Sequence, residues 1–81
     1  MKLLENSSNY VLVELNDNLE ILFSYKTPVA GRNKLGYFRT DKKWSVTTSK
    51  HIDTYLKYVS VVGQMPQEEI NTMLNKVGEV N

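Results

Sequence analysis

The sequence predicts a small α+β domain in which a four-stranded antiparallel sheet is followed by two C-terminal helices packed on one of its faces (order ββββαα). Apolar residues alternate at a period of two along residues 10–25, which is typical of strands, and they recur at helical spacing along residues 52–77. The chain has 81 residues. A chain of this length folds around one core, so we expect a single domain over residues 1–81, ordered from about residue 9 to residue 78.

The first two strands are predicted to form a β-hairpin. Apolar side chains occupy every second position on both arms. The intervening residues 16–18, Asn-Asp-Asn, suit a tight turn because Asn and Asp tolerate positive φ angles better than other residues that carry side chains. We therefore predict that residues 9–15 and 19–26 pair antiparallel, and that residues 1–8 form a loosely docked start.

Two further strands are expected after this hairpin. Pro28 lacks the N–H that a strand donates to its neighbour, so residues 27–30 are predicted to form either an edge or a bent extension of the second strand. The sequence then predicts, in order, a turn over residues 31–36, a third strand over 37–40, a turn over 41–43 and a fourth strand over 44–46.

Two helices complete the predicted fold. The first has an apolar stripe at spacings of three and four residues, made of Ile52, Tyr55, Leu56, Val59 and Val62. Thr47, Thr48 or Ser49 supplies its N-cap, and Gly63 suits its C-terminal end. The second helix begins near Pro66, which is favourable in a first turn. The side chains expected to be largely buried are Trp44, Ile52, Leu56, Ile70 and Leu74.

The composition limits the classes of site and the location. The chain has no cysteine, which excludes disulfides, thiolate zinc sites and thiol nucleophiles. No apolar run reaches the roughly 18–20 residues that span a bilayer, and the N-terminus lacks the apolar stretch of a signal peptide. We therefore expect a cytoplasmic protein that contacts no membrane.

Catalysis and metal binding are not expected either. Ser45, His51 and Asp53 cannot form a triad, because residues two apart on a helix point to different sides. The same spacing does not allow His51 and Asp53 to share a zinc ion, and the glycines are isolated rather than gathered in a phosphate-binding loop. The sequence therefore predicts a protein that is no enzyme and that uses no cofactor or metal.

Positive charge is concentrated in the middle of the chain. The net charge is +1, yet residues 26–57 hold eight lysines and arginines against two aspartates. Cations interleaved with aromatic residues can neutralise phosphates and stack bases, so this segment is a candidate nucleic-acid surface. The alternative is that Tyr25 packs in the core and that the lysines solvate turns or protect an edge strand. The candidate binding residues are Lys26, Arg32, Arg39, Lys42 and Lys43.

The start of the first predicted helix is a second candidate site. Free N–H groups, several hydroxyls and a nearby lysine would suit a phosphate group. The competing interpretation is a helix start with more capping residues than it needs. The candidate residues are Thr47, Thr48, Lys50 and His51.

Residues 24–30 (SYKTPVA), 37–40 (YFRT) and 44–52 (WSVTTSKHI) carry a distinctive pattern. It consists of an aromatic residue, T-x-V-A, a polar turn, a basic-aromatic strand and S-x-T-T-x-x-H. The chain thereby resembles short uncharacterised proteins of tailed bacteriophages, plasmids and their hosts. The resemblance implies a phage or mobile-element origin and a cytoplasmic setting, and it carries over no catalytic residue. The residues that match its final motif include Thr47, Thr48 and His51.

Taken together, the sequence favours a non-enzymatic, phage-type accessory protein that acts by binding nucleic acid. The alternative is a small inhibitor that docks on a host protein such as a polymerase, a nuclease or a defence complex, and a third possibility is a minor virion component. A nucleic-acid surface would require Arg and Lys side chains that converge on one face beside an exposed aromatic residue. A protein inhibitor would instead expose an apolar patch with a polar rim.

Overall fold

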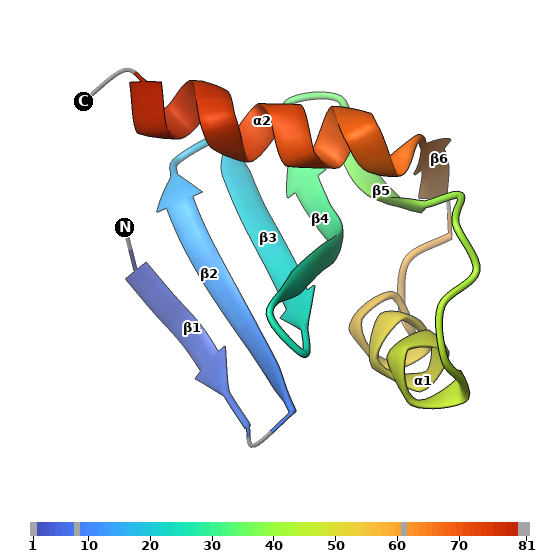
Figure 1. Cartoon of the computed structure of the whole chain (residues 1–81). Helices are drawn as coiled ribbons and strands as arrows, with labels where there is room; N and C mark the ends of the chain where they lie inside the picture. Colours follow the sequence, from blue (N-terminus) through green and yellow to red (C-terminus); the bar gives the residue numbers. More distant parts are fainter. Residues whose placement is uncertain (1, 8, 61, 80–81) are drawn as a thin grey trace.

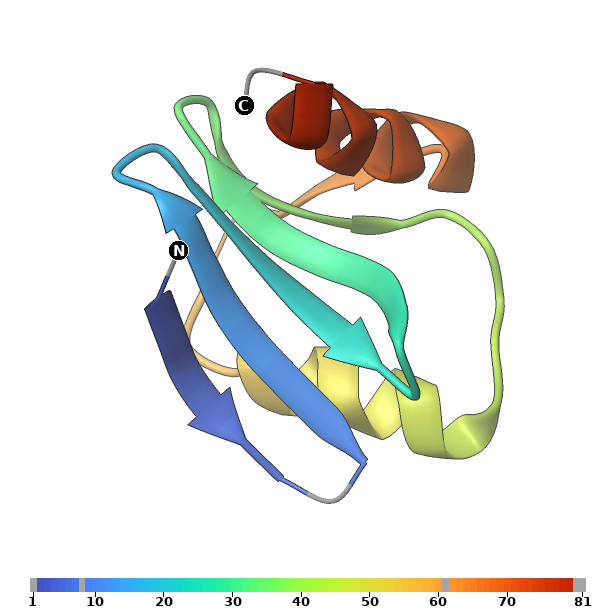
Figure 2. The same ribbon diagram turned by 60° about the vertical axis from the view of Figure 1, so that its left-hand side comes forward.

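The computed structural model describes residues 2–7, 9–60 and 62–79, which form a six-stranded sheet with one helix on each face (Figure 1). The view in Figure 2 shows the twisted sheet between the two helices. The elements in chain order are β1 (Lys2–Asn6), β2 (Tyr10–Asn16), β3 (Leu19–Ser24), β4 (Thr27–Asn33), β5 (Gly36–Thr40), α1 (Val46–Tyr55), β6 (Val62–Met65) and α2 (Gln67–Glu79).

The sheet is mixed and not purely antiparallel. Its strands follow one another in the order β1-β2-β3-β4-β5-β6, and each pair of neighbours is antiparallel except β5 and β6, which are parallel. A parallel pair needs a crossover connection, and α1 lies in that connection. The α+β class predicted from the sequence is confirmed, but the predicted four antiparallel strands are corrected to six.

The first predicted hairpin is present. β2 and β3 pair antiparallel from Tyr10 opposite Ser24 to Asn16 opposite Leu19. The side chain of Asn16 accepts a hydrogen bond from the N–H of Asn18 at 2.8 Å, the local bond for which Asn is favoured in turns. Residues 2–6, expected as a loosely docked start, form β1 instead and pair with β2. Because all five side chains of β1 are exposed, no buried stripe marked this strand in the sequence.

The segment after β3 differs from its prediction. The strand stops at Ser24, and Tyr25 and Lys26 form a two-residue turn with positive φ angles of 49° and 70°. β4 then runs inside the sheet, between β3 and β5, and is neither an edge nor an extension of β3. Pro28 is accommodated because the register with β5 begins only at Ala30, and because the ladder with β3 shifts beside it.

Helix α1 begins earlier and ends earlier than the sequence predicts. Ser45 is its N-cap and accepts from the N–H of Thr48, so none of residues 47–49 caps the helix and residues 44–46 form no strand. The helix ends at Tyr55, and Gly63 lies within β6 rather than at a helix end. The second helix is confirmed, since α2 starts directly after Pro66.

The two helices cover opposite faces of the sheet, which corrects the prediction that both pack on one face. The α1 face contains one core cluster, built around Leu12, Leu22, Val29, Ala30 and Ile52. The α2 face contains another, built around Leu19, Ile21, Phe38 and Ile70. β3 supplies both clusters because its apolar residues Ile21 and Leu22 point to opposite sides of the strand.

Only part of the predicted core is fully enclosed. Ile52 and Ile70 are 1% and 0% exposed, whereas Trp44, Leu56 and Leu74 are half-buried at the margins of the two clusters. Within the ranges that the structure describes, neither helix is long and apolar enough to cross a membrane.

Candidate functional site

Arg32, predicted to bind a ligand, forms an ion pair with an acidic residue of the protein itself. Its Nη2 lies 3.1 Å from Oε1 of Glu20, which is opposite Arg32 in the β3–β4 register and largely buried on the α1 face. The Tyr55 hydroxyl of α1 donates to the other oxygen of Glu20 at 2.7 Å. Burial, and then this hydrogen bond, raise the pKa of the Tyr55 phenol, while the hydrogen bond and charge of Glu20 raise the pKa of Arg32. Glu20, Arg32 and Tyr55 therefore join α1 to the sheet.

Arg39 is also directed toward α1. Its Nη1 lies 3.8 Å from Oδ1 of Asp53, at the limit of an ion pair. Its Nε is buried and has no hydrogen-bond partner within the described residues. About a third of the Arg39 side chain is exposed, so only part of this cation can face a ligand.

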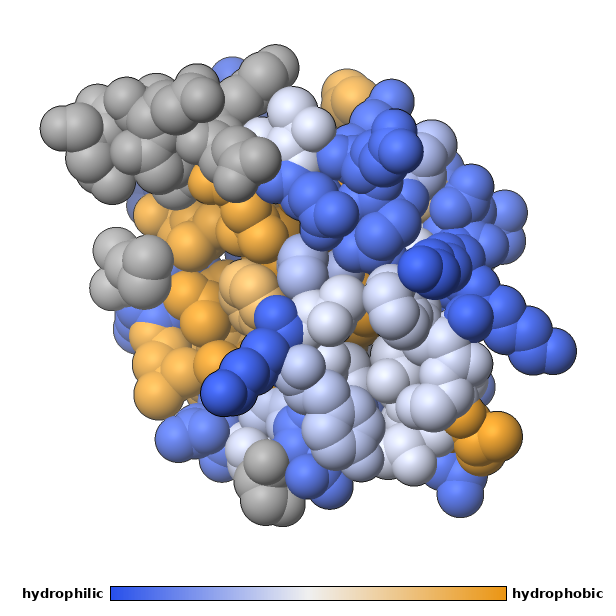
Figure 3. Space-filling view, in the orientation of Figure 1, coloured by the Kyte–Doolittle hydropathy of each residue, from blue (hydrophilic) through white to orange (hydrophobic). Residues whose placement is uncertain are grey.

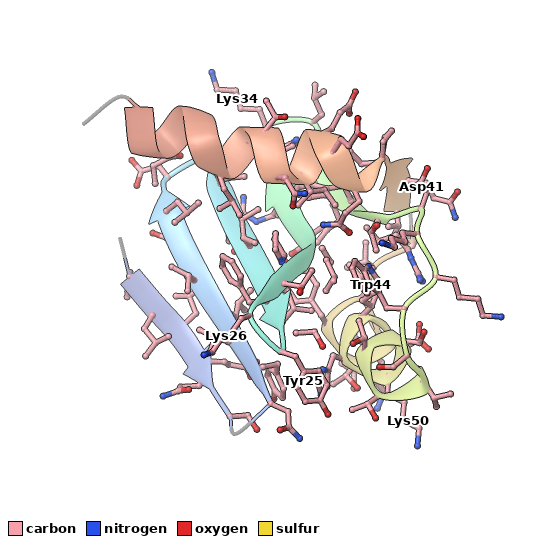
Figure 4. All side chains as sticks on the ribbon, in the orientation of Figure 1. Tyr25, Lys26, Lys34, Asp41, Trp44 and Lys50 are labelled. Atoms are coloured by element: carbon pink, nitrogen blue, oxygen red, sulfur yellow. The ribbon has the colours of Figure 1, made fainter. Side chains whose placement is uncertain are left out.

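The predicted lysines are exposed but lie apart from one another (Figure 4). Lys26 is in the turn between β3 and β4 and extends over the open face of the sheet, whereas Lys50 projects from α1. Lys42 and Lys43 follow β5, and the Lys42 ammonium lies 4.2 Å from the centre of the Trp44 ring. Lys42 and Lys43 are therefore exposed neighbours after β5, whereas Lys26 and Lys50 lie elsewhere.

Thr48 and His51 belong to a hydroxyl network that the sequence did not reveal. Ser24 Oγ lies 2.9 Å from Thr48 Oγ1 and 2.8 Å from His51 Nδ1. Ser24 is only 2% exposed, so its hydroxyl is not accessible as a nucleophile. Ser45 adds a further hydroxyl contact to Thr48 at 3.2 Å. This network satisfies buried polar groups at the α1–sheet contact.

The Ser45 cap and the burial of Thr48 occupy part of the helix start that was predicted to bind an anion. The N–H of Thr48 is used by the Ser45 cap, and the Thr48 side chain is buried. Thr47 and Lys50 are exposed, while His51 is half-buried between the rings of Tyr10 and Tyr25, whose centroids are 5.1 and 5.9 Å from its own. Of the four predicted anion-binding residues, Thr47 and Lys50 are therefore exposed, whereas Thr48 and His51 make contacts within the protein.

The opposite face of the sheet carries an apolar patch, here defined as Leu3, Val11, Val13 and Phe23. Register places these four side chains on the α2 face, because Leu3 is opposite Val13, and Val11 is opposite Phe23. Leu3 is 56% exposed and the other three are half-buried. Figure 3 shows apolar surface on this face, over β1–β3.

A hollow of about 700 Å³ adjoins the apolar patch. Val11 and Phe23 line it together with residues of the β1–β2 connection and of the β3–β4 turn. Tyr25 and Lys26 form its rim, and Tyr25 is 53% exposed. Polar and aromatic side chains thus border an apolar floor, a combination that none of the predicted sites included.

Sequence reasoning missed two groups that hold α1 against the sheet. Glu20 and Ser24 were expected opposite the apolar side of β3, yet both are buried under α1. The signal that could have located them is Leu22, which lies between them on the same side of the strand. Within the described ranges, no group of three or more His, Asp or Glu side chains could hold a metal ion.

Comparison with known proteins identifies a family but no activity. A family model described as a family of unknown function, DUF8033, matches residues 1–72. No curated protein and no solved structure matches the chain. Because the family model covers most of the sequence, the chain belongs to the DUF8033 family.

Proposed function

We propose that this member of the DUF8033 family is a non-enzymatic accessory protein that acts by docking on another protein through the apolar patch and its adjoining hollow. The observation that carries the proposal is the exposed apolar surface over β1–β3 with a polar rim. Apolar patches rimmed by polar residues are a feature of protein–protein interaction sites. The motif resemblance in residues 24–52 favours a phage or plasmid origin, and a protein of the bacterial host as the partner.

The rim of the hollow supports this proposal. Tyr25 and Lys26 both adopt positive φ angles, a conformation that costs residues with side chains about 1–3 kcal/mol. Asn and Gly are the residues that favour such a turn. An exposed tyrosine held in this turn supports contact with a partner, since tyrosine is enriched in protein interfaces.

Site-specific photo-crosslinking tests the protein-docking proposal. A photoreactive phenylalanine analogue replaces Leu3 or Tyr25 in the full chain, which is then irradiated in an extract of the bacterial host. We expect one discrete protein adduct from both positions. Replacing Leu3 with aspartate should weaken capture of that same protein by about tenfold, a loss typical of one central contact.

Matched controls lie outside the apolar patch. Leu35 and Tyr58 are 97% and 91% exposed in a turn and after α1, so the analogue at either position should give no such adduct. Leu35→Asp should leave capture unchanged. Adducts that form equally from patch and control positions, or from neither, would contradict docking through the patch.

Nucleic-acid binding is the second candidate, and the exposed pair Lys42–Lys43 supports it. Among the described ion pairs neither lysine has an acidic partner within 4.0 Å, and Lys42 lies over the Trp44 ring. A cation beside an aromatic ring is one component of single-strand binding surfaces.

Binding to random DNA and RNA across a salt series tests this second candidate. If it is correct, log affinity falls linearly with log salt, because phosphate contacts release counterions. The double change Lys42→Glu with Lys43→Glu should abolish binding, while Lys34→Glu at the distant β4–β5 turn should have a small effect. A parent protein without detectable binding at low salt would rule this function out.

A further inference from the structure

A second cavity lies between α1 and the sheet, on the face opposite the apolar patch. Its volume is about 250 Å³, and it is lined by Glu5, Tyr10, Leu12, Leu22, His51, Thr54 and Tyr55. In the register, Glu5, Leu12 and Leu22 lie across from one another, whereas Asn6, Val11 and Phe23 of the next row point to the other face. The cavity and the apolar patch therefore lie on opposite faces, although Tyr10 lines both this cavity and the hollow beside the patch. The inference below does not depend on the protein-docking function.

Three aromatic rings form part of the cavity wall and two of them are fixed in place. His51 is held through Nδ1 by Ser24 at 2.8 Å, and Tyr55 is held by its hydrogen bond to Glu20 at 2.7 Å. The Tyr10 ring packs against His51 with centroids 5.1 Å apart. Rings that are already oriented lose little conformational entropy when a ligand binds.

The charges around the cavity favour a cation. Glu5 contributes a carboxylate on the exposed strand β1. Glu20 is neutralised by Arg32, but it accepts a hydrogen bond from the Tyr55 hydroxyl and so makes the Tyr55 ring more electron-rich. The faces of aromatic rings attract cations, most strongly where water is partly excluded. Among the described residues, no lysine or arginine lines this cavity.

The remaining lining defines the ligand more closely. Leu12 and Leu22 give an apolar floor, which suits alkyl substituents rather than a hydrated metal ion or a bare ammonium. The volume lies below the roughly 300–1,000 Å³ of drug-sized sites, so the occupant is a small group. We propose that this cavity binds an alkylated ammonium cation, either a free quaternary amine or the methylated end of a lysine side chain.

Titration of the full chain with choline, followed by NMR, tests the proposal. We expect millimolar affinity, with shifts concentrated on the resonances of Tyr10, His51 and Tyr55. The neutral isostere 3,3-dimethylbutan-1-ol has the same shape without the charge and should bind much more weakly. A short peptide that contains trimethyllysine distinguishes the two sources of the cation, because tighter binding of the peptide than of choline identifies a side chain as the ligand.

Two variants separate the charge from the rings. Glu5→Gln on the exposed strand β1 should preserve the fold and weaken the binding of choline by about 2- to 5-fold, as expected for a partly exposed charge pair. Glu69→Gln on α2 is the matched control and should have no effect. Tyr10→Leu should weaken choline by about 3- to 10-fold. Equal binding of choline and its neutral isostere, or no shift at the lining residues, would overturn the inference.

Discussion

Replacing Gly31 with alanine is expected to lower the free energy of unfolding by about 3 kcal/mol or more, the range of severe overpacking in a core. Gly31 lies in the interior strand β4, opposite Phe38 of β5. A Cβ atom there would fall on the backbone oxygen of Glu20, 2.8 Å from Phe38 Cζ and 3.2 Å from Ile21 Cδ1. The backbone of β3 cannot withdraw without breaking its ladder to β4, so the clash cannot be relieved by one side chain.

Chemical denaturation of Gly31→Ala and its parent measures this effect. Gly63→Ala provides the control, because a Cβ at Gly63 would meet its nearest neighbour, the Tyr37 oxygen, at 3.9 Å. The control should stay within about 0.5 kcal/mol of the parent, as ordinary surface changes do. If Gly31→Ala unfolded at the same denaturant concentration as the parent, the close packing of β3, β4 and β5 would be refuted.

Ile52→Ala and Ile70→Ala should each lower the free energy of unfolding by about 2–5 kcal/mol, because both side chains are enclosed and their removal leaves a cavity. Ile52 anchors α1 on one face of the sheet, and Ile70 anchors α2 on the other. The total free energy of unfolding of a typical domain is about 5–15 kcal/mol. We therefore expect each variant to melt at least about 10 °C below the parent.

The double variant distinguishes helices on opposite faces from helices on the same face. Residues with no shared contacts have additive effects to within about 0.5 kcal/mol. The losses in unfolding free energy for Ile52→Ala and Ile70→Ala should therefore add in the double variant. Urea denaturation measures them, in a stabilised parent protein that stays folded when both changes are present. Leu56→Ala, at a half-buried position, should cost less than Ile52→Ala. If the loss in the double variant differed from the sum of the single losses by well over about 0.5 kcal/mol, the two side chains would belong to one shared core.

Local sequence was sufficient for the elements whose stabilising contacts are close in the chain. The β2–β3 hairpin follows from alternation on two arms and from an Asn-Asp-Asn turn whose first side chain binds the N–H of Asn18. The start of α2 follows from Pro66 and the two glutamates of the first turn. These interactions span few residues, so they leave a readable pattern.

The candidate sites were less predictable because their members are far apart in sequence. Exposure of Lys42 and Lys43 is as expected for turn residues. The partners of Arg32 and His51 lie 12 and 27 residues away, at Glu20 and Ser24, and neither pairing leaves a spacing signal. The apolar patch was invisible for a related reason, since alternation in β2 and β3 predicts a buried face but not how far α2 extends over it.

The sequence by itself determined the α+β class, the central hairpin, the strand at residues 37–40 and the second helix. Only the tertiary structure decided that β1 and β6 complete the sheet, that β4 is interior, and that the helices lie on opposite faces. β1 has no buried side chain and β6 has four residues, so hydrogen bonds to a neighbouring strand, not local preference, define them as strands. The sequence did not show which face of the sheet each helix covers, because β3 is apolar on both sides and could pack against a helix on either. The pairing of β6 with β5 settles this point, since β6 lies at the sheet edge between α1 and α2 and lets the chain pass from one face to the other.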